Sequence, residues 1–244
     1  MKMSVKKNTA IQNMRKDVEI MSELILGQLR ELDNLLTSGE LCMESEKKKK
    51  FRETEKTIDE YEIKISDEFI NIISLHKPVA SELRMVIACY RLSINLERIG
   101  DMALKILRIL LEIKQHPNIK DFIDEISNML TLTNNMVEKS ILSLFNNDIE
   151  YAIWTLKNDD IIDEINKKMI KKIIKKNRGQ LSDSQTLSNF INIKIIVSNI
   201  ERMADQATNI AEASIYYLKG EDIRHSDITS VESELEKPSS DKNE

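Results

Sequence analysis

The sequence predicts an all-α protein made of two tandem copies of a three-helix unit. Its 244 residues include only five Gly and three Pro, and aromatic residues make up 5%. Ile, Leu, Lys and Glu are abundant, and this mixture favours long helices over β structure. In addition, one short acidic pattern occurs twice, 104 residues apart. These observations together predict the fold class.

Glycine, proline and one Asn-rich cluster mark the ends of six predicted helices. Proline lacks a backbone N–H, and glycine readily takes the left-handed conformation that ends a helix. In chain order, the helices and the joints that follow them are 8–37 with Gly39, 41–75 with Pro78, 79–115 with Pro117, 119–145 with Asn146–Asp148, 149–177 with Gly179 and 184–219 with Gly220. Such long helices are typical of bundles.

The third and sixth helices each carry an apolar row at the spacing of a bundle core. The row of the third helix is Leu92, Leu96, Ile99, Ala103, Ile106 and Leu110. Its alternating steps of four and three residues keep these side chains on one side of a helix. The row of the sixth helix is Ile193, Ile196, Ile200, Ala207, Ala211 and Leu218. We expect each row to face the other two helices of its unit.

The acidic pattern is part of a longer internal repeat. Its copies are Asn95–Ala103 and Asn199–Ala207, and the same offset relates Ile58-Asp59-Glu60 to Ile162-Asp163-Glu164. A repeat of this length indicates duplication of a whole structural unit. The predicted organisation is an N-terminal extension at 1–7, three-helix repeats at 8–116 and 117–220, and a polar, disordered tail at 221–244.

Each repeat carries a Glu and an Asp one helical turn apart, Glu97 with Asp101 and Glu201 with Asp205. At 100° per residue, Glu97 and Asp101 lie about 140° and 180° from the apolar row. Like charges at this spacing cost roughly 0.2–0.5 kcal/mol on an isolated helix. Because the cost occurs twice, in matching surroundings, we predict a cation between the carboxylates. Oxygen ligands select hard ions such as Mg²⁺, Mn²⁺, Ca²⁺ or Fe³⁺.

Other interpretations of the acidic residues stay open. Arg98 and Arg202 are expected to neutralise nearby acids such as Asp59 and Asp163. The acids can also serve only solubility or partner docking, on a helical scaffold without a metal. A ferritin-like di-iron oxidase is a further alternative, but it needs Glu-x-x-His on two helices. The three histidines, His76, His116 and His225, fall at predicted helix ends or in the tail.

The remaining composition predicts a soluble cytoplasmic protein. Cys42 and Cys89 are isolated, so neither a disulfide framework nor a Cys-based metal site is indicated. No signal peptide or membrane span is visible, and a net charge of −5 argues against nucleic acid as the main partner. The basic runs Lys47–Lys50 and Lys167–Lys176 are interpreted as solvated helix faces, with contact to acidic lipid or to an acidic partner surface as the alternative.

The two acidic segments carry a resemblance to a known family. With Glu-Arg-Ile-Gly-Asp at Glu97–Asp101 and Glu-Arg-Met-Ala-Asp at Glu201–Asp205, the chain resembles the PhoU family, the regulators that accompany bacterial phosphate-specific transport systems. Lys77–Arg84 is similar to the Gln-Pro-Val-Ala-x-Asp-Leu-Arg segment of the family, and Ala207–Glu212 matches as well. The resemblance extends over residues 14–220.

This resemblance implies two three-helix bundles related by pseudo-twofold symmetry. It implies a cytoplasmic, commonly homodimeric, non-enzymatic protein that represses the phosphate-starvation response. The implied partners are the cytoplasmic ATPase subunit of a phosphate ABC transporter and a sensor histidine kinase. The implied cofactors are iron, zinc, manganese or magnesium ions. The ligand candidates that follow from it are Glu97, Asp101, Glu201, Asp205 and Asn209.

The chain departs from the family pattern near both motifs. Met102 and Gln206 stand where the family often has His, and Lys105 stands at the position of Asn209 in the other repeat. A lysine there can lie against Asp101 and take the place of a metal ion. We therefore expect the second repeat to hold the better metal site.

Overall fold

The structure is a computed structural model, and it describes residues 2–39, 41–113, 117–177 and 184–223. Its helices are α1 (Lys2–Thr37), α2 (Ser45–Asn71), α3 (Ala80–Ile113), α4 (Ile123–Phe145), α5 (Ile149–Asn177) and α6 (Ser184–Lys219). A π-helical turn, η1 (Ile72–His76), follows α2, and a 3-10 turn, η2 (Pro117–Asp121), precedes α4. The described part of the chain is all-α, which confirms the predicted fold class.

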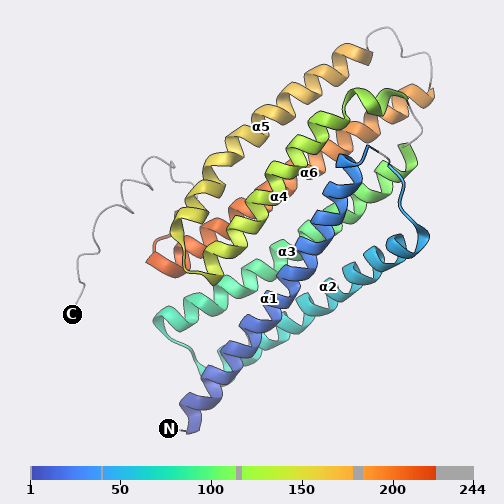
Figure 1. The fold of residues 1–244 in the computed structure, drawn as a ribbon. Helices are drawn as coiled ribbons and strands as arrows, with labels where there is room; N and C mark the ends of the chain where they lie inside the picture. Colours follow the sequence, from blue (N-terminus) through green and yellow to red (C-terminus); the bar gives the residue numbers. More distant parts are fainter. Residues whose placement is uncertain (1, 40, 114–116, 178–183, 224–244) are drawn as a thin grey trace.

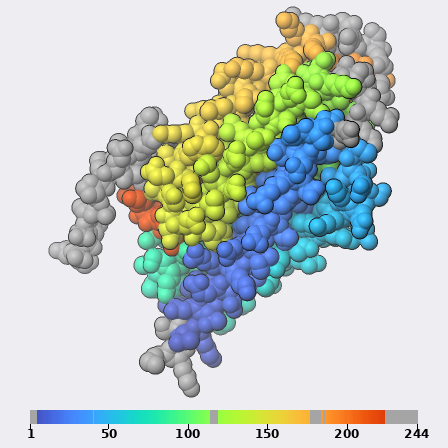
Figure 2. Space-filling view, in the orientation of Figure 1, coloured from blue at the N-terminus to red at the C-terminus, as the bar shows by residue number. Residues whose placement is uncertain are grey.

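The helices form an elongated body made of two three-helix units (Figure 1). α1, α2 and α3 pack on one another, and α4, α5 and α6 do the same. α3 lies against α6 over much of its length, and α1 contacts α4 beside them. The helices α2 and α5 therefore lie at the two outer sides. Figure 2 shows α5, α4 and α1 side by side across one face of the molecule.

One large hydrophobic cluster runs through both units. Leu96 and Ile99 of the predicted α3 row and Ile200 of the α6 row are fully buried, and all three belong to one cluster with side chains from every helix. Leu218 is only half-buried, because α6 ends one residue later. Each fully buried aliphatic side chain contributes about 1.5–3 kcal/mol relative to an exposed one. The two units are thus joined by apolar packing rather than by a linker.

The predicted helix limits agree with the structure for α5 and α6 and shift elsewhere. α1 begins at Lys2 rather than at residue 8, and its first turns are held by an ion pair of 2.7 Å between Lys7 and Glu82. α2 begins at Ser45 rather than at residue 41, since the preceding segment is non-helical and buries Leu41 and Met43. Helix periodicity by itself does not reveal these local tertiary contacts.

Several predicted joints adopt the left-handed backbone conformation. Gly39, Asn147 and Gly220 have φ of 67°, 55° and 77°, which are the values expected of residues that end helices. Beyond Gly220, Ile223 is buried against the α5–α6 pair, so the chain does not leave the body at residue 221. The rest of the predicted disordered tail, 224–244, lies outside the described residues.

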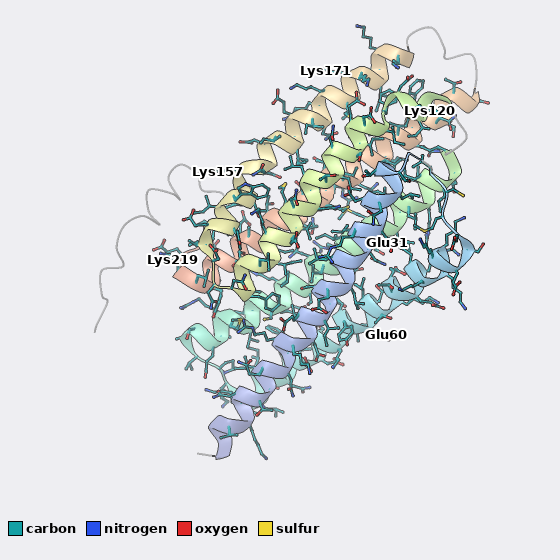
Figure 3. The ribbon with its side chains drawn as sticks, viewed as in Figure 1. Glu31, Glu60, Lys120, Lys157, Lys171 and Lys219 are labelled. Carbon is teal, nitrogen blue, oxygen red and sulfur yellow. The ribbon has the colours of Figure 1, made fainter. Side chains whose placement is uncertain are left out.

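Much of the basic run on α5 is paired with acids. Lys167 and Lys168 pair with acids one turn earlier on α5, and Lys176 pairs with Asp121 of η2 at 2.6 Å. Figure 3 places Lys157 and Lys171 along α5, at the outside of the body. In the ranges that the structure describes, every helix is too short or too polar to cross a membrane.

Glu68 of α2 lies beside Asp17 of α1, which also binds Lys64 with an Oδ2–Nζ distance of 2.7 Å. Burial and the neighbouring Asp17 carboxylate raise the pKa of Glu68 from 4.5 to about 7. The folded state then binds the proton more tightly than the unfolded state. The stabilisation that this proton gives to the folded state is complete at acidic pH, and it is lost as the pH rises from about 4.5 through 7.

We expect Glu68→Gln to remove this part of the pH dependence and to be more stable than the parent at pH 8. Urea unfolding at several pH values between about 5 and 8 measures both effects. Asp67→Asn, at an exposed neighbouring position, is the control and should keep the parental pH profile. Equal pH profiles for Glu68→Gln and the parent would contradict the assignment.

Candidate functional site

Glu97 and Asp101 lie on the side of α3 that is turned away from its buried row and toward α2. Glu97 is half-buried and Asp101 is exposed, whereas Leu96 just before Glu97 and Ile99 between the two acids are fully buried. Burial raises the pKa of Glu97, and the carboxylates of Asp101 and then of Asp59 on α2 raise it further. The motif therefore points away from the buried row, as predicted, and the carboxylates that act on Glu97 from another helix, Asp59 and Glu62, belong to α2.

The helix α2 adds two carboxylates, Glu55 and Asp59, one turn apart. Burial is the main cause that raises the pKa of both, and Asp101 across on α3 raises both further. A hydrogen bond between the carboxyl groups of Glu55 and Asp101 also raises the pKa of Glu55. Such a bond requires a proton on one of the two groups. We name Glu55, Asp59, Glu97 and Asp101 the first acidic cluster.

The second repeat builds the same arrangement between α5 and α6. Burial and the Asp205 carboxylate raise the pKa of Asp159 to about 6. Burial also raises the pKa values of Glu201 and Asp205, and Asp163 raises each of them further. Arg202 opposes the shifts of both α6 residues. We name Asp159, Asp163, Glu201 and Asp205 the second acidic cluster.

Half of each cluster was not among the sequence-based ligand candidates. Glu55 and Asp59 of α2, and Asp159 and Asp163 of α5, face the predicted motifs. A signal for them exists in the sequence, because both pairs are spaced by four residues and are related by the same offset of 104. The offset is apparent at Asp59 and Asp163, which stand in identical Ile-Asp-Glu segments, whereas Glu55 and Asp159 lie outside these segments and differ in residue type.

The predicted ion pairs of the two arginines are not formed. Among the described residues, no ion pair within 4.0 Å joins Arg98 to Asp59 or Arg202 to Asp163. Instead, Lys167 binds Asp163 at 3.0 Å. An i,i+4 lysine on the same helix reaches the carboxylate more easily than an arginine on the neighbouring helix. The arginines still act on nearby acids without these ion pairs, since Arg98 opposes the raised pKa of Glu97 and Arg202 opposes those of Glu201 and Asp205.

A surface groove of about 580 Å³ runs along the α3–α6 contact beside the first cluster. Asp101 and Lys105 both line it, and Arg202 lines the α6 wall. Asn209 lines a separate hollow of about 240 Å³ that Glu212 shares. Lys105 thus lies near the first cluster as predicted, whereas Asn209 is oriented toward α3.

The two clusters concentrate negative charge where no basic side chain fully compensates it. Each helix pair contributes four carboxylates. Partial burial and mutual repulsion disfavour the ionised forms of three in each cluster, namely Glu55, Asp59 and Glu97 in the first and Asp159, Glu201 and Asp205 in the second. A multivalent cation would remove this penalty, and an all-oxygen set fits Mg²⁺, Mn²⁺ or iron better than Zn²⁺. Within the described residues, however, no three His, Cys, Asp or Glu side chains form a ready coordination site. Ion binding therefore needs some carboxylates to change rotamer.

Neither cluster contains a histidine. Among the described residues, His76 lies in η1 and lines a hollow of about 150 Å³ with Glu68, away from either cluster. His116 and His225 lie outside the described residues. The side-chain set of a ferritin-like di-iron oxidase, which needs a His one turn from a Glu on two helices, is therefore not found in the two clusters.

Comparisons with known proteins place the chain in a family. The PhoU domain matches residues 18–110 and 126–214, once for each repeat. The phosphate-specific transport system accessory protein PhoU homolog of Pseudomonas aeruginosa is 26% identical over 229 residues, which are 94% of this chain and 92% of the relative. The Escherichia coli K12 accessory protein PhoU is 26% identical over 218 residues, 89% and 87% of the two chains.

The fold agrees with solved structures as well. The crystal structure of PhoU from Pseudomonas aeruginosa superimposes with a TM-score of 0.78 at 25% identity, covering 88% of this chain and 99% of that one. The phosphate transport system regulatory protein PhoU from Streptococcus pneumoniae has the same fold, with a TM-score of 0.74 at 21% identity over 88% and 98%. The domain match spans most of the chain in two copies, and the protein belongs to the PhoU family.

Proposed function

We propose that this protein is a negative regulator of phosphate uptake and of the phosphate-starvation response. The observation that carries the proposal is the match of both repeats to the PhoU domain. Full-length relatives are named accessory proteins of the phosphate-specific transport system. Membership in this family makes the chain an accessory protein of phosphate transport rather than an enzyme.

The proposed mechanism is steric and conformational. The protein acts in the cytoplasm, as a homodimer, and links the ATPase subunit of a phosphate ABC transporter to a sensor histidine kinase. The continuous core supports this role, because a rigid body can pass a change of contacts from one partner to the other. The outer helices α2 and α5 carry many exposed charged residues, such as Glu60 and Lys171 (Figure 3), which suit polar and reversible contacts.

We also propose that iron, manganese, magnesium or zinc ions bind at the acidic clusters, with oxygen-preferring ions favoured. Glu97, Asp101, Glu201 and Asp205 are ligand candidates together with their α2 and α5 neighbours, and Asn209 remains a further one. The support is the raised pKa of paired carboxylates in both repeats. A bound ion would neutralise each cluster and fix the spacing of two helices.

The two clusters should differ in affinity. Lys105 and Arg108 line the groove next to the first cluster, and Arg108 opposes the raised pKa of Glu55. The residues at the same places in the second repeat are Asn209 and Glu212, which carry no positive charge. Although Lys167 of α5 binds Asp163, the second cluster has less compensation on α6 than the first has on α3, and we expect it to bind the ion more tightly.

Deletion of the gene tests the regulatory role. We expect a strain without this protein to express its phosphate-scavenging genes in medium with ample phosphate, because the repressing contact is missing. Transcript levels at high and low phosphate measure the effect, and a plasmid copy should restore repression. Normal repression in the deletion strain would refute the regulatory role.

Co-purification tests the proposed partners. From cells grown with ample phosphate, the tagged protein should recover both the transporter ATPase and the sensor kinase. Recovery of neither would favour a scaffold with other contacts. Metal analysis of the same sample decides separately whether ions accompany the protein, since the scaffold alternative has no metal.

A further inference from the structure

A partly enclosed cavity of about 300 Å³ lies between α1 and the beginning of α2, and its lining includes no residue of either acidic cluster. Its apolar lining includes Leu24 of α1, Phe51 of α2 and Met43 of the segment between them. Phe51 and Met43 are 4% and 7% exposed, so they form a fixed wall. A cavity of this size is at the lower end of the range for small-molecule sites.

Gly27 lines this cavity from the middle of α1. A glycine inside a helix costs about 1 kcal/mol relative to alanine. Its backbone is not in the left-handed region, and a Cβ placed on it would meet no atom within 4 Å. Neither a turn nor close helix packing therefore requires glycine here. The absent side chain leaves open space that a ligand can fill.

Gln28, the next residue, ties the two walls together. It is 3% exposed, and its Nε2 donates a hydrogen bond of 2.9 Å to the Phe51 carbonyl oxygen. This bond crosses from α1 to α2 and holds the apolar wall in place. Among the described residues, no hydrogen-bond donor reaches the Gln28 Oε1 atom. The cavity is thus bounded by a buried polar contact rather than by mobile side chains.

The rim of the cavity has opposite charges on its two sides. Lys47 and Lys50 lie on the α2 side, and Glu23 and Glu31 lie on the α1 side. Figure 3 labels Glu31 on α1. In the described part of the chain, none of these four side chains makes an ion pair within 4.0 Å. An anionic group is therefore drawn to the α2 side, near the N-terminal end of that helix.

The second repeat does not preserve this cavity chemistry. At the offset of 104, Tyr151 and Trp154 stand in place of Lys47 and Lys50. Both rings pack against Lys139, whose Nζ is 4.6 Å and 4.8 Å from their centroids. Gly27 is replaced by Thr131. The open cavity with two rim lysines is a feature of the first repeat and is not a necessary product of the repeat fold.

We infer that this cavity binds a small amphipathic anion. Its apolar body lies against Leu24, Met43 and Phe51 in the space left by Gly27, and its anionic head lies near Lys47 and Lys50. The site is separate from the acidic clusters and does not depend on a bound metal.

Two fluorescent probes with the same apolar body test the inference on the full chain. N-phenyl-1-naphthylamine is neutral, and 1-anilinonaphthalene-8-sulfonate carries an anionic head. We expect both to bind saturably at one site, the sulfonate more tightly. Gly27→Leu fills the space and should lower the affinity for both probes at least tenfold. Lys47→Glu with Lys50→Glu should lower the affinity for the sulfonate at least tenfold and the affinity for the neutral probe less than twofold.

Asn34→Leu is the matched control, since it adds the same side chain at an exposed position of α1 outside the cavity. It should bind both probes as the parent does. Gly27→Leu is expected to stay folded with an unchanged or higher Tm, because leucine is the better helix former. The inference would be overturned if Gly27→Leu bound either probe with the affinity of the parent. It would also be overturned if the lysine changes weakened the binding of both probes equally. Non-saturable binding to the parent would overturn it too.

Discussion

Gly100→Leu is expected to lower the free energy of unfolding by about 2–3 kcal/mol, because it overpacks a full interior. A Cβ on Gly100 would lie 3.1 Å from Cδ1 of Ile25 on α1 and 3.7 Å from Cδ1 of Ile58 on α2. The remaining leucine atoms would have to enter among the Ile25 and Ile58 side chains, which are both fully buried. Urea unfolding, followed by circular dichroism, measures the loss.

Two matched variants separate packing from helix propensity. Gly100→Ala should be close to neutral, since the nearest atom is the far end of the flexible Ile25 side chain and alanine favours the helix. Gly27→Leu makes the same exchange at a position where an added Cβ would meet no atom within 4 Å. It should not lower the free energy of unfolding. If Gly100→Leu is as stable as the parent, the packing of α3 against α1 and α2 is not as described.

Glu201→Gln with Asp205→Asn should abolish stabilisation by metal ions at the second cluster. For the parent, an ion at 100 times its dissociation constant adds about 2.7 kcal/mol to the free energy of unfolding. The double variant should gain little at that cluster, because it loses two anionic ligands. In metal-free buffer near pH 8 it should be more stable than the parent, since repulsion with Asp163 is removed. Thermal unfolding with chelator and with Mn²⁺ measures both effects.

Glu19→Gln with Glu23→Gln is the matched control, because these exposed acids are also four residues apart but on α1. It should keep the parental response to Mn²⁺. Variants of Glu97 and Asp101 report the weaker first cluster in the same assay. An identical Mn²⁺ response of parent and Glu201/Asp205 variant, with equal metal content by elemental analysis, would exclude the second cluster as a metal site.

The family and the helical architecture were accessible from sequence because the signals are local. Steps of three and four residues in α3 identified Leu96 and Ile99 as core residues, and both are fully buried. The limits of α5 and α6 were correct. The start of α1 was missed, because the ion pair between Lys7 and Glu82 joins residues 75 positions apart. No periodicity within one helix reports such a contact.

The candidate site was predicted only in half. Glu97 and Asp101 stand out because their segment is repeated, and their outward direction follows from helix geometry. Glu55 and Asp159 belong to helices whose rotation toward α3 and α6 depends on packing. The expected ion pair of Arg202 with Asp163 is not formed for the same reason, since Lys167 on α5 is the closer partner of Asp163.

By itself the sequence determined the helices, their duplication and the acidic motifs, because backbone periodicity and repeated residues are properties of neighbouring positions. Only the tertiary structure decided which second helix faces each motif and joined the two repeats through one core. It also decided that Gly27 opens a cavity whereas Gly100 fills a tight contact. Two glycines in helix interiors are alike in sequence, and the free volume around each one depends on side chains brought from other helices.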